Sequence, residues 1–218
     1  MTPDFQAAAI RAAEILISHN ITAAPVAPMP ILKSIPNVMV LTFAEMALSI
    51  NEDRDSIVRS FNESQDAVTF TKRIDDELNY FVVYNQRLPF YILQRGLARE
   101  LGHIIMQHDG TKPPAIRKDE AMCFALHLIC PRPLVNAIHQ SGINLTVEAL
   151  GNLTGCYERC LAILRELPVV SVPAELNRKI REQFTPYIND FIRFQQFLSS
   201  GDTTPVADFG TFMDGYEE

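Results

Sequence analysis

The chain has 218 residues, of which 47% are apolar and 21% charged, and its formal net charge is −7 at pH 7. This length and composition are typical of a globular chain that can build an apolar core without disulfides or structural metals. An acidic chain without a basic stripe lacks the electrostatic attraction that dominates nucleic-acid binding, so we expect no direct contact with DNA or RNA.

Membrane insertion and export are also disfavoured by the sequence. No uninterrupted apolar run approaches the roughly 20 residues that a membrane-spanning helix needs. The first residues include Asp4 where a signal peptide would carry lysines. We therefore expect a cytoplasmic protein with no membrane association. The four cysteines form no Cys-x-x-Cys pair and lie at Cys123, Cys130, Cys156 and Cys160.

The N-terminal segment predicts an amphipathic helix. Thr2 is a suitable N-cap, Pro3 suits the first helical position, and the apolar pattern at helical spacing ends at His19 and Asn20. The four prolines between residues 24 and 36 then predict a loop with at most one short turn.

A small sheet is predicted next. Residues 37–43 read as a buried strand, and residues 44–61 as one or two helices with a polar break at 51–53. Residues 67–71 and 80–84 are rich in β-branched and aromatic side chains, and a polar turn between them predicts a hairpin.

Helices dominate the remainder, from about Pro89 to Phe197. The order of one helix, a small sheet of about three strands and then helices indicates an α+β fold rather than alternating βαβ units. Residues 199–218 carry five acidic residues and no lysine or arginine, which predicts an acidic, mobile tail.

Residues 97–108 carry the pattern that points to chemistry. Metal-dependent peptidases place His-Glu-x-x-His on a helix, because two histidines four residues apart lie on one face and can both reach a zinc ion. Here Glu100 stands at the position of the general base and His103 at that of the second ligand. The first ligand position holds Arg99, whose guanidinium stays protonated and has no lone pair for zinc.

This region resembles the ImmA/IrrE family of small zincin-like metallopeptidases. Residues 97–103, Leu-Ala-Arg-Glu-Leu-Gly-His, are similar to the family's Leu-Ala-His-Glu-Leu-Gly-His and depart from it only at Arg99; a further histidine follows at His108. Residues 120–131 resemble the family's second motif, which begins Glu-Ala-x-x-Phe-Ala and ends in proline. The resemblance implies that Glu120 would be the third zinc ligand.

The resemblance extends over about residues 5–165 and implies a zincin-like α+β fold. In such a fold a small sheet of about three strands packs on a mainly helical domain that carries the metal-site helix. We accordingly expect an ImmA/IrrE-like domain at 1–165, a C-terminal helical extension at 166–198 and the acidic tail at 199–218.

Arg99 is the departure that matters most for function. Catalytic zinc sites use three protein ligands and a water, so the loss of one ligand leaves a site too weak for catalysis. We hypothesise that Arg99 stands where the metal stood and pairs with Glu120 or Glu100. We therefore expect no cofactor and an inactive enzyme.

Other interpretations of the same residues stay open. A substitute zinc site could use His103, Glu120 and either His108 or His127, with Glu100 as the general base. Alternatively, His103 is a core histidine bonded to Glu120, His108 caps its helix, and Glu100 pairs with a neighbouring arginine.

Three functions follow from these alternatives. The resemblance implies a link to transcription regulation in phages, mobile elements or stress responses, because ImmA/IrrE proteins cleave helix-turn-helix repressors. We expect a regulatory protein that binds such a repressor without cleaving it, and the acidic charge suits a basic DNA-binding partner. The first alternative is an active zinc metalloendopeptidase, and the second is a non-catalytic adaptor or structural protein of a phage or mobile element.

Overall fold

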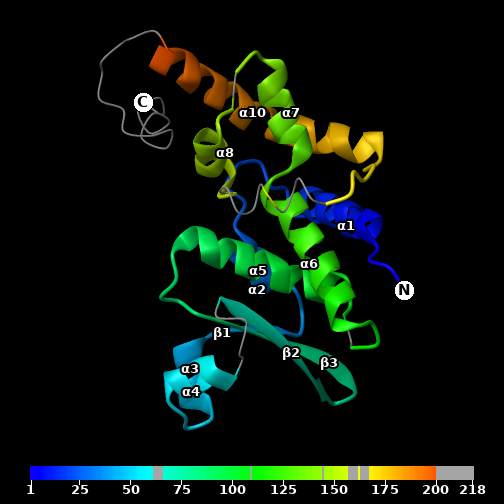
Figure 1. Ribbon diagram of the computed structural model, residues 1–218, viewed down its shortest axis with the longest axis vertical. Coiled ribbons are helices and arrows are strands. Elements are labelled where there is room, and N and C mark those ends of the chain that lie inside the picture. The colour runs from blue at the N-terminus through cyan, green and yellow to red at the C-terminus, as the bar shows by residue number, and fades with distance from the viewer. Residues whose placement is uncertain (61–65, 109, 144, 157–161, 163–166, 200–218) are drawn as a thin grey trace.

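The computed structural model describes residues 1–60, 66–108, 110–143, 145–156, 162 and 167–199. Helices and one small sheet make up this part of the chain, which confirms the predicted α+β class (Figure 1). The predicted acidic tail lies outside the described residues from position 200 onward, as does Cys160.

The sheet has three strands in the order β1-β3-β2. Strand β1 (Val38–Thr42) runs parallel to β3 (Glu77–Tyr84), and β2 (Ala67–Ile74) runs antiparallel to β3. Asp75 and Asp76 form the turn between β2 and β3 and both have a positive φ, as a tight two-residue hairpin turn requires. The predicted strand and hairpin are therefore confirmed. The expected burial of the strand is wrong, because β1 is only half-buried and Met39 is exposed.

Helices cover the two faces of the sheet unequally. Val82 and Val83 are adjacent, so their side chains point to opposite faces, and both are fully buried. Val82 joins the main core, on the side of α5 (Phe90–Ile105), whereas Val83 packs with Phe43 of α3 (Phe43–Ser49) in a second, smaller cluster. Figure 1 shows the sheet between α5 and α3.

The predicted break after α3 is also confirmed. Helix α3 is followed by α4 (Arg54–Ser60), with the polar residues 51–53 between them. Thr42 and Glu45 form a reciprocal capping box that starts α3 where β1 ends.

Helix α6 (Pro114–Ile129) is the centre of the helical layer. It packs against α1 (Phe5–Ser18) on one side and α5 on the other. A Cβ atom added to Gly102 of α5 would lie 2.9 Å from the carbonyl oxygen of Ala121, so glycine allows the two helices to approach closely.

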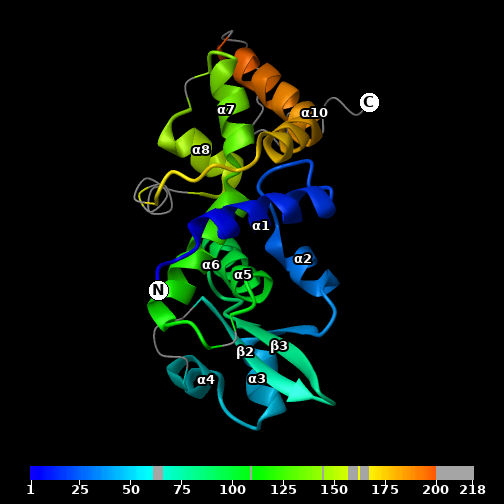
Figure 2. The same ribbon diagram turned by 90° about the vertical axis from the view of Figure 1, so that its right-hand side faces the viewer.

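The C-terminal helices extend the same core. Helix α10 (Ala174–Ser199) packs on α1 and on α7 (Arg132–Gln140), and the buried Ile180 and Phe184 belong to the main core cluster (Figure 2). The short α8 (Val147–Thr154) precedes it.

Two sequence predictions for the N-terminal region are wrong. Asp4, not Thr2, caps α1, because the Asp4 carboxylate accepts a hydrogen bond from the amide of Ala7. The proline-rich segment forms the seven-residue helix α2 (Pro28–Ser34) rather than a loop. Its prolines lie in the first turn, where amides have no partner within a helix, and Leu32 anchors it in the core.

Within the described residues, no single helix is long and apolar enough to cross a membrane, although α6 and α7, bent by 41° at their junction, pass that test when taken together.

Candidate functional site

Arg99 of α5 binds two carboxylates. Its Nε and Nη2 atoms donate to Oε1 of Glu100 at 2.9 and 2.8 Å, and Nη2 also donates to Oδ1 of Asp66 at 3.0 Å. Nη2 lies 2.8 Å from the carbonyl oxygen of Ala67 as well, so the guanidinium ties α5 to the start of β2. The Arg99 side chain is 16% exposed and that of Glu100 only 4%.

The local sequence explains why Asp66 can reach this position. Gly96 lies one helical turn before Glu100, and a Cβ atom there would come within 3.0 Å of the Asp66 carboxylate. Glycine therefore leaves room for the acid to lie against α5. Arg95 adds a second cation 4.0 Å from Asp66.

Burial and charge act in opposite directions on Glu100. Burial raises the pKa of Glu100, and the neighbouring Arg99 lowers it without cancelling the effect of burial. The same ion pairs raise the pKa of Arg99 against its own burial, so the guanidinium stays charged.

Three of the predicted site residues form a chain of hydrogen bonds. The Nδ1 atoms of His103 and His108 lie 2.9 Å apart, and Nε2 of His108 lies 2.8 Å from Oε2 of Glu120. Glu120 is fully buried, and His108 and Glu120 both lie in the core next to the end of α5.

Glu120 also binds two donors from outside the predicted set. The Lys112 ammonium donates to both carboxylate oxygens, at 2.9 and 2.7 Å, and the backbone amide of Asp4 donates to Oε1 at 2.8 Å. Burial raises the pKa of Glu120, but the hydrogen bonds from Lys112, Asp4 and His108 outweigh it and the pKa is lowered. The carboxylate therefore remains ionised and is neutralised by lysine.

The ionised Glu120 fixes the protons along the chain. Because a carboxylate only accepts, Nε2 of His108 carries the proton, and the Nδ1 of a neutral His108 is an acceptor. Nδ1 of His103 must then donate, which leaves Nε2 of His103 with a lone pair. Burial, with the neighbouring His108 ring and the charges of Arg99 and Arg117, lowers the pKa of His103 to about 3, and burial also lowers the pKa of His108.

His127 does not join this group. It lies two turns beyond Glu120 on α6, but its Nδ1 atom is 2.9 Å from the carbonyl oxygen of Cys123, and the ring borders a separate cavity near α10. Of the two substitute ligands considered from the sequence, the structure brings only His108 to His103 and Glu120.

The pairings differ in part from those predicted. Arg99 binds Glu100 as expected, but Lys112 rather than Arg99 binds Glu120. His103 contacts Glu120 only through His108. His108 does not cap α5, which ends at Ile105 with Met106 as its C-cap.

Sequence reasoning missed Asp66 and Lys112 entirely. Both lie in short connecting segments outside the two motifs, 33 residues before Arg99 and eight residues before Glu120 respectively. An aspartate directly before the predicted strand at residues 67–71 was the only sequence signal for Asp66. Lys112 follows His108 closely, and no pattern marked it.

The contacts described do not fit a catalytic zinc ion. Two nitrogen ligands of a tetrahedral zinc lie about 3.4 Å apart, whereas the two histidine nitrogens are 2.9 Å apart and share a proton. Both nitrogens of His108 are engaged, and a lysine ammonium covers the carboxylate of Glu120. Arg99, four residues before His103, has no lone pair to offer a metal.

Comparison with known proteins gave no match to a family model, to a curated protein or to a solved structure. The likeness to the ImmA/IrrE family therefore stays a prediction that rests on residues 97–108 and 120–131.

Proposed function

We propose that this chain is a cytoplasmic regulatory protein with an ImmA/IrrE-like metallopeptidase fold and a degraded zinc site, which binds a helix-turn-helix repressor without cleaving it. The observation that carries the proposal is the contact of the Arg99 guanidinium with Glu100 and Asp66. This contact supports loss of catalysis for two reasons. Arginine stands where a zinc ligand is expected, and it binds Glu100, the carboxylate that would act as general base. Binding a protein needs neither a zinc ligand nor a general base.

Charge supports the choice of partner. The chain carries a net charge of −7, and its last 20 residues contain five acids and no base. A helix-turn-helix protein presents a basic surface to DNA, and opposite net charges accelerate association and favour the correct partner.

Metal content tests the first half of the proposal. The chain is purified without chelators as wild type and as Arg99→His, and zinc is measured by elemental analysis. We expect no zinc in the wild type and about one zinc per chain in Arg99→His, because the variant restores a histidine four residues before His103. Zinc binding in the variant also requires Glu120 to exchange Lys112 for the metal.

Two controls make this result specific. Arg95→His places a histidine on the same helix one turn earlier and should gain no zinc. The double variant Arg99→His/His103→Ala should lose the zinc that the single variant gained. Stoichiometric zinc in the wild type would contradict the proposal.

The second half is tested with helix-turn-helix proteins encoded next to this chain. Each is mixed with the purified chain, and complex formation is followed by size-exclusion chromatography and integrity by gel electrophoresis. A stable complex with an intact partner is the expected result. Cleavage of the partner would support the peptidase alternative, and absence of any complex would support the adaptor alternative.

One observation favours the active-peptidase alternative. His103, His108 and Glu120 are three residue types that bind zinc, and they lie within hydrogen-bonding distance of one another. That alternative requires Lys112 to leave Glu120 and the two histidine rings to separate. It predicts zinc in the wild type that disappears in His108→Gln, and proteolysis that disappears in Glu100→Gln.

A further inference from the structure

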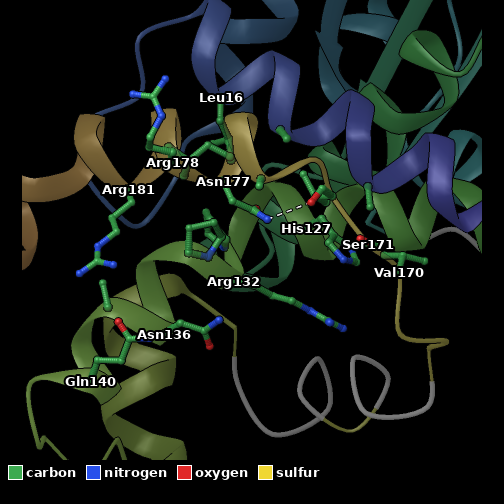
Figure 3. Close-up of a pocket in the computed structure, with 18 residues that line it drawn as sticks. Leu16, His127, Arg132, Asn136, Gln140, Val170, Ser171, Asn177, Arg178 and Arg181 are labelled. Atoms are coloured by element: carbon green, nitrogen blue, oxygen red, sulfur yellow. Dashed lines mark hydrogen bonds between the residues drawn. The ribbon is translucent and has the colours of Figure 1, made fainter.

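A cavity lies where α1, the end of α6, α7 and the start of α10 meet, and Arg99 does not line it (Figure 3). Its volume is about 540 Å³, within the range of roughly 300–1,000 Å³ that is typical of small-molecule sites. The proposed function assigns it no role.

The charge of this cavity is opposite to that of the chain. Its lining includes Arg132, Arg178 and Arg181 but no aspartate or glutamate among the described residues, although the chain carries a net charge of −7. Arg178 pairs with Glu182 and points away from the other two. Arg132 and Arg181 lie on opposite sides of the cavity (Figure 3). The ion pairs of the described part of α10 are those of Arg178, Lys179 and Arg193, and neither Arg132 nor Arg181 pairs with a described carboxylate.

Two helix N-termini add to the positive potential. Arg132 is the first residue of the nine-residue α7, and Ala174 is the first residue of the 26-residue α10; both border the cavity. The N-terminus of a helix carries about half a positive charge, which favours anions. In the first turn of α7 the Arg132 amide is the one that can add to this dipole, because Pro133 has no N–H and the Leu134 amide donates to the carbonyl oxygen of Pro131. Glu175 in the first turn of α10 offsets part of the contribution of that helix.

A buried histidine with one unpaired ring nitrogen also lines the cavity. His127 is only 7% exposed, and its Nε2 atom is buried with no hydrogen-bond partner among the described residues. Because the carbonyl oxygen of Cys123 can only accept, Nδ1 of His127 carries a proton and Nε2 of the neutral ring has a lone pair. Nε2 can accept a hydrogen bond from a ligand hydroxyl. Buried polar atoms rarely lack partners, so this atom indicates a polar ligand group.

The part of the cavity wall between α1 and α10 is apolar. Ala13 and Leu16 of α1 and Ile180 of α10 line it, and all three are buried. A ligand that fills the cavity therefore needs an anionic group, at least one hydroxyl and a part that tolerates apolar contact.

We propose that this cavity binds a small organic phosphate such as a nucleotide or a sugar phosphate. The guanidinium of Arg132, at the N-terminus of α7, holds the phosphate group. Nε2 of His127 accepts a hydrogen bond from a ligand hydroxyl. Arg181 lies across the cavity from Arg132, and the apolar wall around Leu16 packs against the carbon skeleton of the ligand. Arginine is suited to phosphate because its planar guanidinium can donate two parallel hydrogen bonds.

The test is isothermal titration calorimetry of the full chain with adenosine monophosphate, glucose 6-phosphate, inorganic phosphate, adenosine and succinate. We expect one organic phosphate to bind with 1:1 stoichiometry and a Kd below about 1 mM, and Arg132→Ala to weaken it at least about tenfold. Adenosine and succinate should not bind. Arg193→Ala, a charge change on α10 outside the cavity, is the matched control and should leave the affinity unchanged.

A second readout locates the ligand. The ring resonances of His127 should shift on addition of the bound phosphate, and Arg181→Glu should abolish that shift while leaving the melting temperature of the free chain unchanged. The proposal is overturned if neither organic phosphate binds below about 1 mM. Equal binding of succinate, or equal affinity of Arg132→Ala and wild type, overturns it too.

Discussion

The Nη2 atom of Arg99 lies 3.0 Å from Oδ1 of Asp66, and this contact joins the middle of α5 to the residue that precedes β2. The same nitrogen donates to the carbonyl oxygen of Ala67. Arg99 therefore connects the helix that carries the peptidase-like motif with the sheet.

Truncation of Arg99 should destabilise the fold strongly. Arg99→Ala removes the cation from two largely buried acids, Asp66 and Glu100, and removal of one partner of a buried ion pair typically costs about 3–5 kcal/mol. Urea unfolding followed by circular dichroism measures the change. Arg11→Ala, which breaks an exposed pair with Glu14, should cost less than about 1 kcal/mol. Equal losses in the two variants would mean that the Arg99 cluster is not structural.

The sequence predicted helices and strands better than it predicted which side chains contact one another. The hairpin could be predicted because alternation and a polar turn are both encoded within residues 67–84, and α5 because its apolar spacing is continuous. Helix α2 could not, because its stability depends on the burial of Leu32 against distant segments, which proline counting ignores.

The ion pairs of the candidate site show the same limit. Glu100 could be matched to Arg99 because the two are adjacent in the sequence. Asp66 and Lys112 reach the site through the packing of β2 on α5 and through the connection before α6, and neither contact has a periodic signature. The cavity near α10 brings together residues from four separate elements, so it could be found only in three dimensions.

Stability should fall as the solution becomes acidic below pH 6.5. The pKa values of His103, His108 and His127 are all lowered in the folded chain, mainly by burial, that of His103 to about 3. A lowered folded-state pKa gives stability that is complete above the unfolded value of 6.5 and is lost as the pH falls towards the folded value. Each group then contributes up to about 1.4 kcal/mol per pH unit.

The measurement is the free energy of unfolding in urea between pH 7.5 and about 5 with EDTA present, a window above most carboxylate titration. Glu100, whose pKa is raised by burial, opposes the trend there, but as one group against three histidines. His103→Gln should reduce the slope by about one proton per chain. A free energy that rises as the pH falls through this window would contradict burial of the neutral histidines.

Gly102→Ala should separate α5 from α6. The new Cβ atom would lie 2.9 Å from the carbonyl oxygen of Ala121 and 3.1 Å from a ring carbon of Phe124. Neither the backbone of α6 nor a fully buried ring can yield easily, so we expect a loss of about 1–3 kcal/mol, although alanine is the better helix former. Thermal unfolding provides the measurement, with Ala115→Ser at an exposed position of α6 as control. A gain in stability would show that the two helices can move apart at no cost.

The proton arrangement of the two histidines near Glu120 is a further testable consequence. The carboxylate requires His108 to carry its proton on Nε2, and the 2.9 Å contact between the two Nδ1 atoms then requires His103 to carry its proton on Nδ1. The ¹⁵N chemical shifts of the two rings at pH 7.5 should show these opposite tautomers.

In Glu120→Gln the side-chain amide can donate to His108 instead, so both tautomers should become free to reverse. Lys112→Met removes a partner of Glu120 but not its contact with His108, and should leave the tautomers unchanged. A wild-type spectrum with the same tautomer in both rings would contradict the hydrogen-bond chain and reopen the question of a metal held between His103 and His108.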